Sequence, residues 1–243
     1  MFRNLFFAAI LAALCAGLVV SAIQYFRVTP LILHAETFEG EAGHSHDHGA
    51  VADPAEAVVA ETEEWAPQDG FERTAYTVLA NLLAAAGFAL VIGAVSLFAN
   101  IPITFANGAL WGIAGFLTFT LAPAFGLAPE LPGMPAADLG ARQLWWIGTA
   151  IATGAAILLV AKTRASWAIA VAIALVVIPH IVGAPVAPDE PSGVPAHLAT
   201  EFAAATFGAS AAFWIVLGTV FGRLNDLFAA RMGTQSIPAG VAA

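Results

Sequence analysis

Six long apolar stretches, separated by short breaks and one long polar loop, constrain this chain more than any other feature of its sequence. Each stretch has about 20 residues, which is the length that an α-helix needs to cross a bilayer. Backbone polar groups in lipid must be satisfied within their own segment, so these stretches are predicted to be helices. The predicted spans cover residues 5–27, 74–98, 105–127, 143–161, 166–184 and 199–221.

The composition supports a membrane protein. Apolar residues make up 60% of the 243 residues and charged residues only 10%, and the mean hydropathy is +0.83. Soluble domains carry roughly 25% charged residues. We therefore predict an all-α integral membrane protein of about six transmembrane helices arranged as three helical hairpins. The net charge of −9 argues against nucleic acid as a partner.

The first span resembles a signal peptide in its basic start and in Val20-Ser21-Ala22, which has the character of a cleavage site. Its apolar run is longer than the roughly 7–15 residues usual for a signal peptide, so we expect the helix to be retained. Cleavage would leave five spans.

The distribution of charge predicts the orientation. With the N-terminus inside, the inner segments carry Lys or Arg at five positions, and only one of the 17 acidic residues, Asp226, falls there. This is the positive-inside pattern. We predict a multi-pass membrane protein with both termini in the cytoplasm.

The organisation that follows has six parts. They are a first transmembrane helix (1–28), an acidic histidine-containing outer loop that is largely disordered (29–73), a second span with its inner turn (74–104), a hairpin of spans three and four (105–164), a hairpin of spans five and six (165–222) and a cytoplasmic tail (223–243).

Two outer segments repeat one pattern. Residues 129–143 read PELPGMPAADLGARQ and residues 188–202 read PDEPSGVPAHLATEF, which aligns Asp138 with His197 and Arg142 with Glu201. Residues four positions apart share a helix face. Internal repeats are common in transporters, although coincidence in a chain rich in Ala, Pro and Gly is the alternative.

Ionisable groups near membrane depth are costly and indicate function. His180 follows Pro179 near the outer end of span five and is the strongest single candidate. With it we expect one outer vestibule of metal-binding side chains, formed by His180, His197, Glu201, Asp138, Glu130 and Met134. Imidazole, carboxylate and thioether ligands together suit a borderline divalent ion such as Co²⁺, Ni²⁺ or Zn²⁺.

Structural roles compete with this reading. Asp138 suits the N-cap of span four as well as it suits a ligand, and His197 suits a plain interfacial position. Trp145 and Trp146 suit an aromatic belt, and the series Ala204, Gly208 and Ala212 a close helix contact. The arginines that begin two spans are predicted to form ion pairs: Arg73 with Asp69 or Glu72, and Arg142 with Asp138 or Glu130.

The outer loop also contains HSHDH, with His44, His46 and His48 at alternate positions. Imidazoles at this spacing in a flexible chain bind divalent ions loosely. We interpret the cluster as a collector of metal; an ordinary polar loop is the alternative.

The sequence resembles the CbtA family, the larger membrane subunit of predicted bacterial cobalt transporters. The resemblance is carried by FERT (71–74), LANLL (79–83), AGFA (86–89), PELPGMPAAD (129–138), ARQLWW (141–146) and PHIVGAP (179–185). It implies Co²⁺ uptake linked to cobalamin supply and a small partner, CbtB, with one span and a histidine-bearing end. It lends weight to Glu130, Asp138, Arg142 and His180.

We therefore predict the membrane subunit of a transition-metal importer, with Co²⁺ as the transported ion. The alternatives are a nickel or zinc transporter and a non-transporting scaffold that binds metal and recruits the small partner. A third alternative is an enzyme or electron-transfer subunit that uses His180 and His197 as haem ligands. No Walker A motif occurs, so we expect no ATP hydrolysis of that kind. We also expect no enzyme activity and neither haem nor a nucleotide as cofactor.

Overall fold

The computed structural model describes residues 2–43, 67–163 and 165–235, and these are helical with no strand. The elements are α1 (Phe2–Ile23), η1 (Gln24–Val28), α2 (Thr29–Gly43), α3 (Phe71–Ala99), α4 (Phe105–Phe116), η2 (Leu117–Leu121), α5 (Ala122–Ala124), α6 (Leu139–Thr163), α7 (Ser166–Val182) and α8 (Ala196–Gln235). The predicted all-α class is confirmed.

Five of the described helices are long and apolar enough to cross a membrane: Arg3–Phe38, Phe71–Ala99, Phe105–Ala124, Leu139–Thr163 and Ala196–Arg231. The sixth predicted span corresponds to α7, which is apolar but has 17 residues. At 1.5 Å per residue α7 is about 26 Å long, slightly shorter than the hydrocarbon core of a bilayer.

Two spans continue through a proline by means of a π-helical turn. η1 ends two residues before Pro30, and η2 ends two residues before Pro123. Proline lacks the N–H that an α-helix directs to the carbonyl four residues earlier, and a π-helical turn is one way in which a helix continues past such a break. The first helix therefore extends through Pro30 to Gly43. The prediction of a largely disordered loop from residue 29 is therefore wrong for residues 29–43, and residues 44–66 of that loop lie outside the described residues.

Small residues bring the central helices close together. A Cβ added to Gly218 of α8 would lie 2.2 Å from the carbonyl oxygen of Gly108 on α4, and one added to Gly112 would lie 2.3 Å from the carbonyl oxygen of Trp214. Large aromatic rings fill the adjacent space, with Phe119 stacked on Trp214 at 5.5 Å. The predicted close contact at Ala204, Gly208 and Ala212 is not found, because a Cβ on Gly208 would meet nothing within 4 Å.

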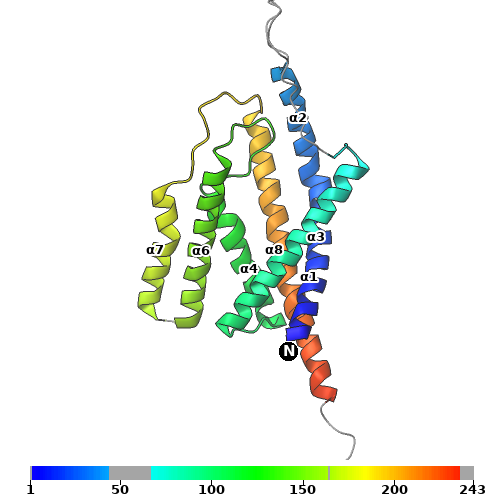
Figure 1. The fold of residues 1–243 in the computed structure, drawn as a ribbon, viewed down its shortest axis with the longest axis vertical. Helices are drawn as coiled ribbons and strands as arrows, with labels where there is room; N and C mark the ends of the chain where they lie inside the picture. Colours follow the sequence, from blue (N-terminus) through cyan, green and yellow to red (C-terminus); the bar gives the residue numbers. More distant parts are fainter. Residues whose placement is uncertain (1, 44–66, 164, 236–243) are drawn as a thin grey trace, which may run out of the picture.

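The helix pairs differ partly from the predicted hairpins. α1 packs against α3 and α8, α8 packs against α4, and α6 packs against α7 (Figure 1). Spans five and six, α7 and α8, do not pack against each other, because α6 lies between them and the 183–195 segment carries the chain past it (Figure 1). The expected hairpin of these two spans is therefore wrong as a packing unit.

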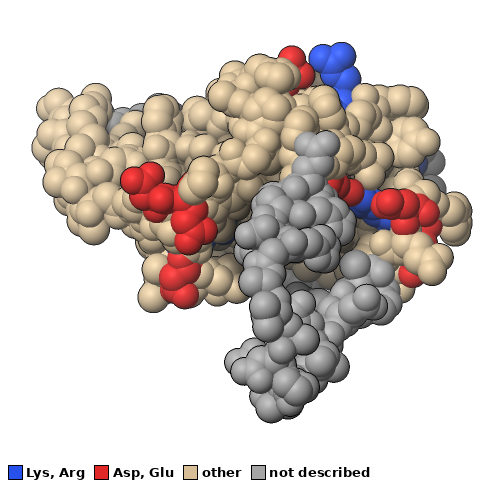
Figure 2. All heavy atoms as spheres, turned by 90° about the horizontal axis from the view of Figure 1, so that it is seen from above, with Lys and Arg blue, Asp and Glu red and all other residues tan. Residues whose placement is uncertain are grey.

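The two ends of the molecule differ in charge. At the end where α2 finishes, which we call the acidic end, Figure 2 shows several groups of acidic side chains. The described segments that meet at this end carry Glu36, Asp69, Glu72, Glu130, Asp138, Asp189, Glu190 and Glu201. The opposite end, which we call the turn end, carries the α3–α4 and α6–α7 turns. There Lys162 Nζ donates to the carbonyl of Ala99 at 2.6 Å.

Candidate functional site

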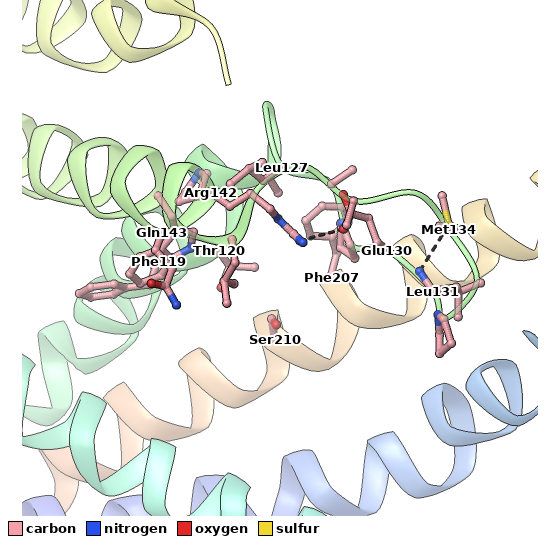
Figure 3. A pocket seen from close by; sticks show the side chains of 18 of the residues that line it. Phe119, Thr120, Leu127, Glu130, Leu131, Met134, Arg142, Gln143, Phe207 and Ser210 are labelled. Atoms are coloured by element: carbon pink, nitrogen blue, oxygen red, sulfur yellow. Dashed lines mark hydrogen bonds and ion pairs between the residues drawn. The ribbon is translucent and has the colours of Figure 1, made fainter. Parts of the chain in front are cut away.

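A pocket of about 1000 Å³ opens at the acidic end beneath the turn that precedes α6. Its walls come from η2 and α5, from the 127–136 segment, from the first two turns of α6 and from α8, which contributes Phe207 and Ser210 (Figure 3). We call it the Glu130 pocket. Most of its lining is apolar, so each polar group in it stands out.

The central polar feature of this pocket is an ion pair. Glu130 Oε2 lies 2.8 Å from Arg142 Nη2, and the two side chains are 24% and 29% exposed. Both residues line the pocket, and Figure 3 shows the guanidinium extended toward the carboxylate. The pair therefore holds a negatively charged carboxylate in a largely apolar setting.

Met134 brings a sulfur atom to the same pocket. Its Sδ accepts a hydrogen bond from the backbone N–H of Leu131 at 3.4 Å, and Leu131 itself is buried in the core. The second repeat segment supports this turn, because Ser192 Oγ donates to the carbonyl of Gly133 at 3.2 Å. The two similar segments thus meet at the acidic end.

Asp138 has a structural contact. Its Oδ1 accepts a hydrogen bond from the backbone N–H of Ala141 at 2.8 Å, which is the geometry of an N-cap at the start of α6. The side chain is exposed. Asp138 therefore orients the helix that carries Arg142.

His180 lies in a different pocket of about 630 Å³, between η2, α6 and α7. Its ring meets Trp145 and Phe125 in edge-to-face contacts, at centroid distances of 5.6 and 6.0 Å. Trp145 Nε1 donates to the carbonyl of Pro179 at 3.2 Å. We call this space the His180 pocket. Trp145, which the sequence assigns to an aromatic belt, therefore also contacts the imidazole of His180.

His197 and Glu201 lie elsewhere again. Both are exposed on the first turns of α8, and Glu201 lines a groove with Arg27 and Pro30. The single vestibule that we expected is therefore not formed, because α7 packs on α6 and carries His180 away from α8. Within the described ranges no three His, Cys, Asp or Glu side chains gather into a metal-binding group. His44, His46 and His48 lie outside the described residues.

An ion-pair cluster joins α2 to α3, and the sequence predicted only its Arg73–Asp69 part. Arg73 contacts Asp69 at 2.8 Å and also pairs with both carboxylate oxygens of Glu36. Glu72, the other predicted partner of Arg73, instead accepts a hydrogen bond from the backbone N–H of Gln68 at 3.3 Å. Glu36 was missed because it falls in the segment predicted to be disordered.

A family model for CbtA, described as a probable cobalt transporter subunit, matches residues 2–226. The chain belongs to the CbtA family. Neither a search of curated proteins nor a search of solved structures found a match. Membership of this family, together with the apolar helices, makes the chain a multi-pass membrane subunit of a probable cobalt transport system. A subunit implies a partner chain.

Proposed function

We propose that this chain imports Co²⁺ across a bacterial inner membrane, with the acidic end outside and both termini in the cytoplasm. The distribution of basic residues supports this orientation, because Arg3, Lys162, Arg223 and Arg231 lie toward the turn end. An acidic outer face raises the local concentration of cations. The His44–His48 segment would add a loose collector on the same side.

The observation that carries the proposal is the Glu130–Arg142 pair beside Met134. Arg142 balances the charge of the carboxylate while no metal is present, and a divalent cation competes with it for the same oxygens. A carboxylate oxygen and a thioether sulfur are a mixed donor set that favours a borderline transition metal over Mg²⁺ or Ca²⁺. The Glu130 pocket is thus the proposed point of capture.

The His180 pocket is the proposed second station. An imidazole is a common ligand for this class of ion, and its contacts with Trp145 and Phe125 fix the orientation of the ring. η2 and α5 contribute walls to both pockets. In this proposal three further residues at the acidic end act as additional metal ligands or contribute to its electrostatic field: His197, Glu201 and Asp138.

The energy would come from the membrane potential, which favours inward movement by about 2.3 kcal/mol per charge per 100 mV. The partner would be a small single-span subunit with a histidine-bearing end, and the imported ion would serve cobalamin supply. A nickel or zinc transporter and a non-transporting scaffold are the competing functions.

The experiment is metal uptake by cells that express this chain with and without the small partner, using Co²⁺, Ni²⁺ and Zn²⁺ in parallel. We expect Co²⁺ uptake that falls in His180→Ala and falls less when His44, His46 and His48 are all replaced by alanine. Preferred uptake of another ion would reassign the cargo. Metal binding without any uptake, even with the partner, would establish the scaffold instead.

A further inference from the structure

Two threonine hydroxyls on α6 are buried without a protein partner. Thr149 is 0% exposed and Thr153 is 4% exposed. The Oγ1 atoms of both residues lack a hydrogen-bond partner within the described part of the chain, and Thr206 on α8 is the third such residue there. A buried hydroxyl without a partner costs free energy, so its retention requires a reason.

Other buried or helical hydroxyls of this protein donate a hydrogen bond to their own helix, whereas Thr149 and Thr153 do not. Ser21 Oγ donates to the carbonyl of Gly17 at 2.7 Å, and Thr219 Oγ1 donates to that of Ile215 at 2.6 Å. Thr77 does the same to Arg73 at 2.8 Å. Bonding to the carbonyl four residues earlier is the usual solution inside a helix. Thr149 and Thr153 do not adopt it.

The two threonines share one face of α6 with Trp145 and Ile157, since these four residues follow one another at intervals of four. Trp145, Thr153 and Ile157 all line the His180 pocket. Thr149 lies on the same face between them. Polar groups therefore lead along this face from the imidazole of His180 toward the middle of the membrane.

The opposing wall is the π-helical turn η2, which contributes Leu117 and Leu121 to the pocket. π-helical turns inside α-helices occur frequently at functional sites. One turn beyond Thr153 toward the turn end, the pocket is bounded by the apolar side chain of Ile157, while Val176 of α7 lines the same pocket one turn below His180. The polar side chains on this face of α6 therefore end at Thr153, and the next residue on the face, Ile157, is apolar.

We propose that Thr149 and Thr153 form a hydrated station for the transported divalent cation below His180, between α6, α7 and η2. The hydroxyls form hydrogen bonds with water molecules of the ion's hydration shell, because no atom among the described residues serves as their partner. Ile157 closes the station toward the turn end. This inference rests on the proposed function, because it places the cargo of that transport.

The first test compares stability with transport in the double variant Thr149→Val/Thr153→Val. Valine keeps the shape of the side chain, and the hydroxyls bond to water rather than to the protein, so the Tm in detergent should stay within about 2 °C of the parent value. Co²⁺ uptake should fall about tenfold, because the hydration shell loses its contacts in the barrier region. The control is Thr219→Val, whose hydroxyl donates to the carbonyl of Ile215, and it should leave uptake unchanged.

Unchanged uptake would overturn the proposal, because the hydroxyls would then have no part in transport. A Tm shift of several degrees would overturn it as well, because a rise would mean that the hydroxyls are buried without water and a fall that they make structural bonds. Failure of the parent protein to take up Co²⁺ would reject the proposed function and leave this inference to the second test.

The second test measures water access and needs no transport. In a Cys15→Ser background, which removes the one cysteine of the chain, Thr153→Cys should react with a charged, membrane-impermeant thiol reagent added at the acidic end. The matched control is Ala156→Cys, which is also buried on α6, at 3% exposure. Reaction at Thr153 alone, slowed by Co²⁺, is the expected result. Equal reaction at both positions, or at neither, would contradict a hydrated station.

Discussion

Arg142 Nη2 on α6 lies 2.8 Å from Glu130 Oε2 inside a largely apolar pocket at the acidic end. The side chains of Glu130 and Arg142 are 24% and 29% exposed, so water partly screens their attraction, and the pair contributes on the order of 1 kcal/mol. We therefore expect a divalent cation to displace the arginine at low cost. The ion pair therefore orients the carboxylate of Glu130 and is still weak enough for a cation to replace Arg142.

Replacing Arg142 by glutamine should tighten Co²⁺ binding. Without its competitor the carboxylate of Glu130 is free, and we expect an affinity gain of about fivefold, close to 1 kcal/mol. Titration calorimetry on the detergent-solubilised protein measures it. Arg27→Gln is the control, because it removes the same charge in the groove beside Glu201 and outside the Glu130 pocket. Weaker binding in Arg142→Gln would show that the arginine supports the site.

The two roles of Asp138 can be separated by one pair of variants. Asp138→Ala should lower stability by about 1 kcal/mol, because the N–H of Ala141 loses its cap. Asp138→Ser keeps a capping oxygen and removes the carboxylate. If Asp138 acts through the cap, thermal unfolding and Co²⁺ uptake should both be nearly normal in the serine variant. Normal stability with lost uptake would instead make Asp138 a ligand.

The spans could be predicted because an apolar run of about 20 residues is by itself enough to indicate a membrane-spanning helix. The sequence could not predict which helices pack against each other, because packing depends on which helix faces come into contact. Nothing local in the sequence distinguishes Gly112 and Gly218, which touch backbone across α4 and α8, from Gly208, which touches nothing within 4 Å. Pro30 also misled the prediction: it suggests a helix end, yet the π-helical turn before it lets the helix continue.

The glycine contact between α4 and α8 should be sensitive to a single methyl group. Gly218→Ala would place a Cβ 2.2 Å from the carbonyl oxygen of Gly108, so the helices must separate. We expect a loss of about 1–3 kcal/mol, the usual cost of overpacking. Gly208→Ala on the same helix is the matched control and should be neutral or stabilising. Differential scanning fluorimetry compares them, and equal Tm values would contradict the close contact.

The Arg73 cluster should hold α2 against α3. Glu36→Gln removes one of its carboxylates, so we expect faster amide hydrogen exchange in α2 beyond Pro30, with α1 unchanged. Glu72→Gln is the control, because Glu72 makes no ion pair within 4 Å among the described residues. Unchanged exchange in Glu36→Gln would mean that α2 is held by its apolar contacts alone.

The candidate site was predictable only in part. Glu130 and Arg142 lie in the turn before α6 and at its start, and their proximity in sequence made an ion pair foreseeable. His180 and His197 are also close in sequence, yet α7 packs on α6 and α8 packs on α4, so the two histidines line different parts of the molecule. The unpartnered hydroxyls of Thr149 and Thr153 are invisible in the sequence, because most threonines in helices bond to their own backbone.

The central claim is that Co²⁺ enters through the Glu130 pocket. The most direct measurement is Co²⁺ uptake into proteoliposomes that contain this chain with its small partner, driven by an imposed inside-negative potential. Glu130→Gln keeps the shape and removes the charge; Glu190→Gln makes the same change on an exposed carboxylate outside the pocket. We predict that Glu130→Gln lowers uptake about tenfold at limiting Co²⁺ while Glu190→Gln leaves it nearly unchanged. Equal uptake by the two variants would contradict the account.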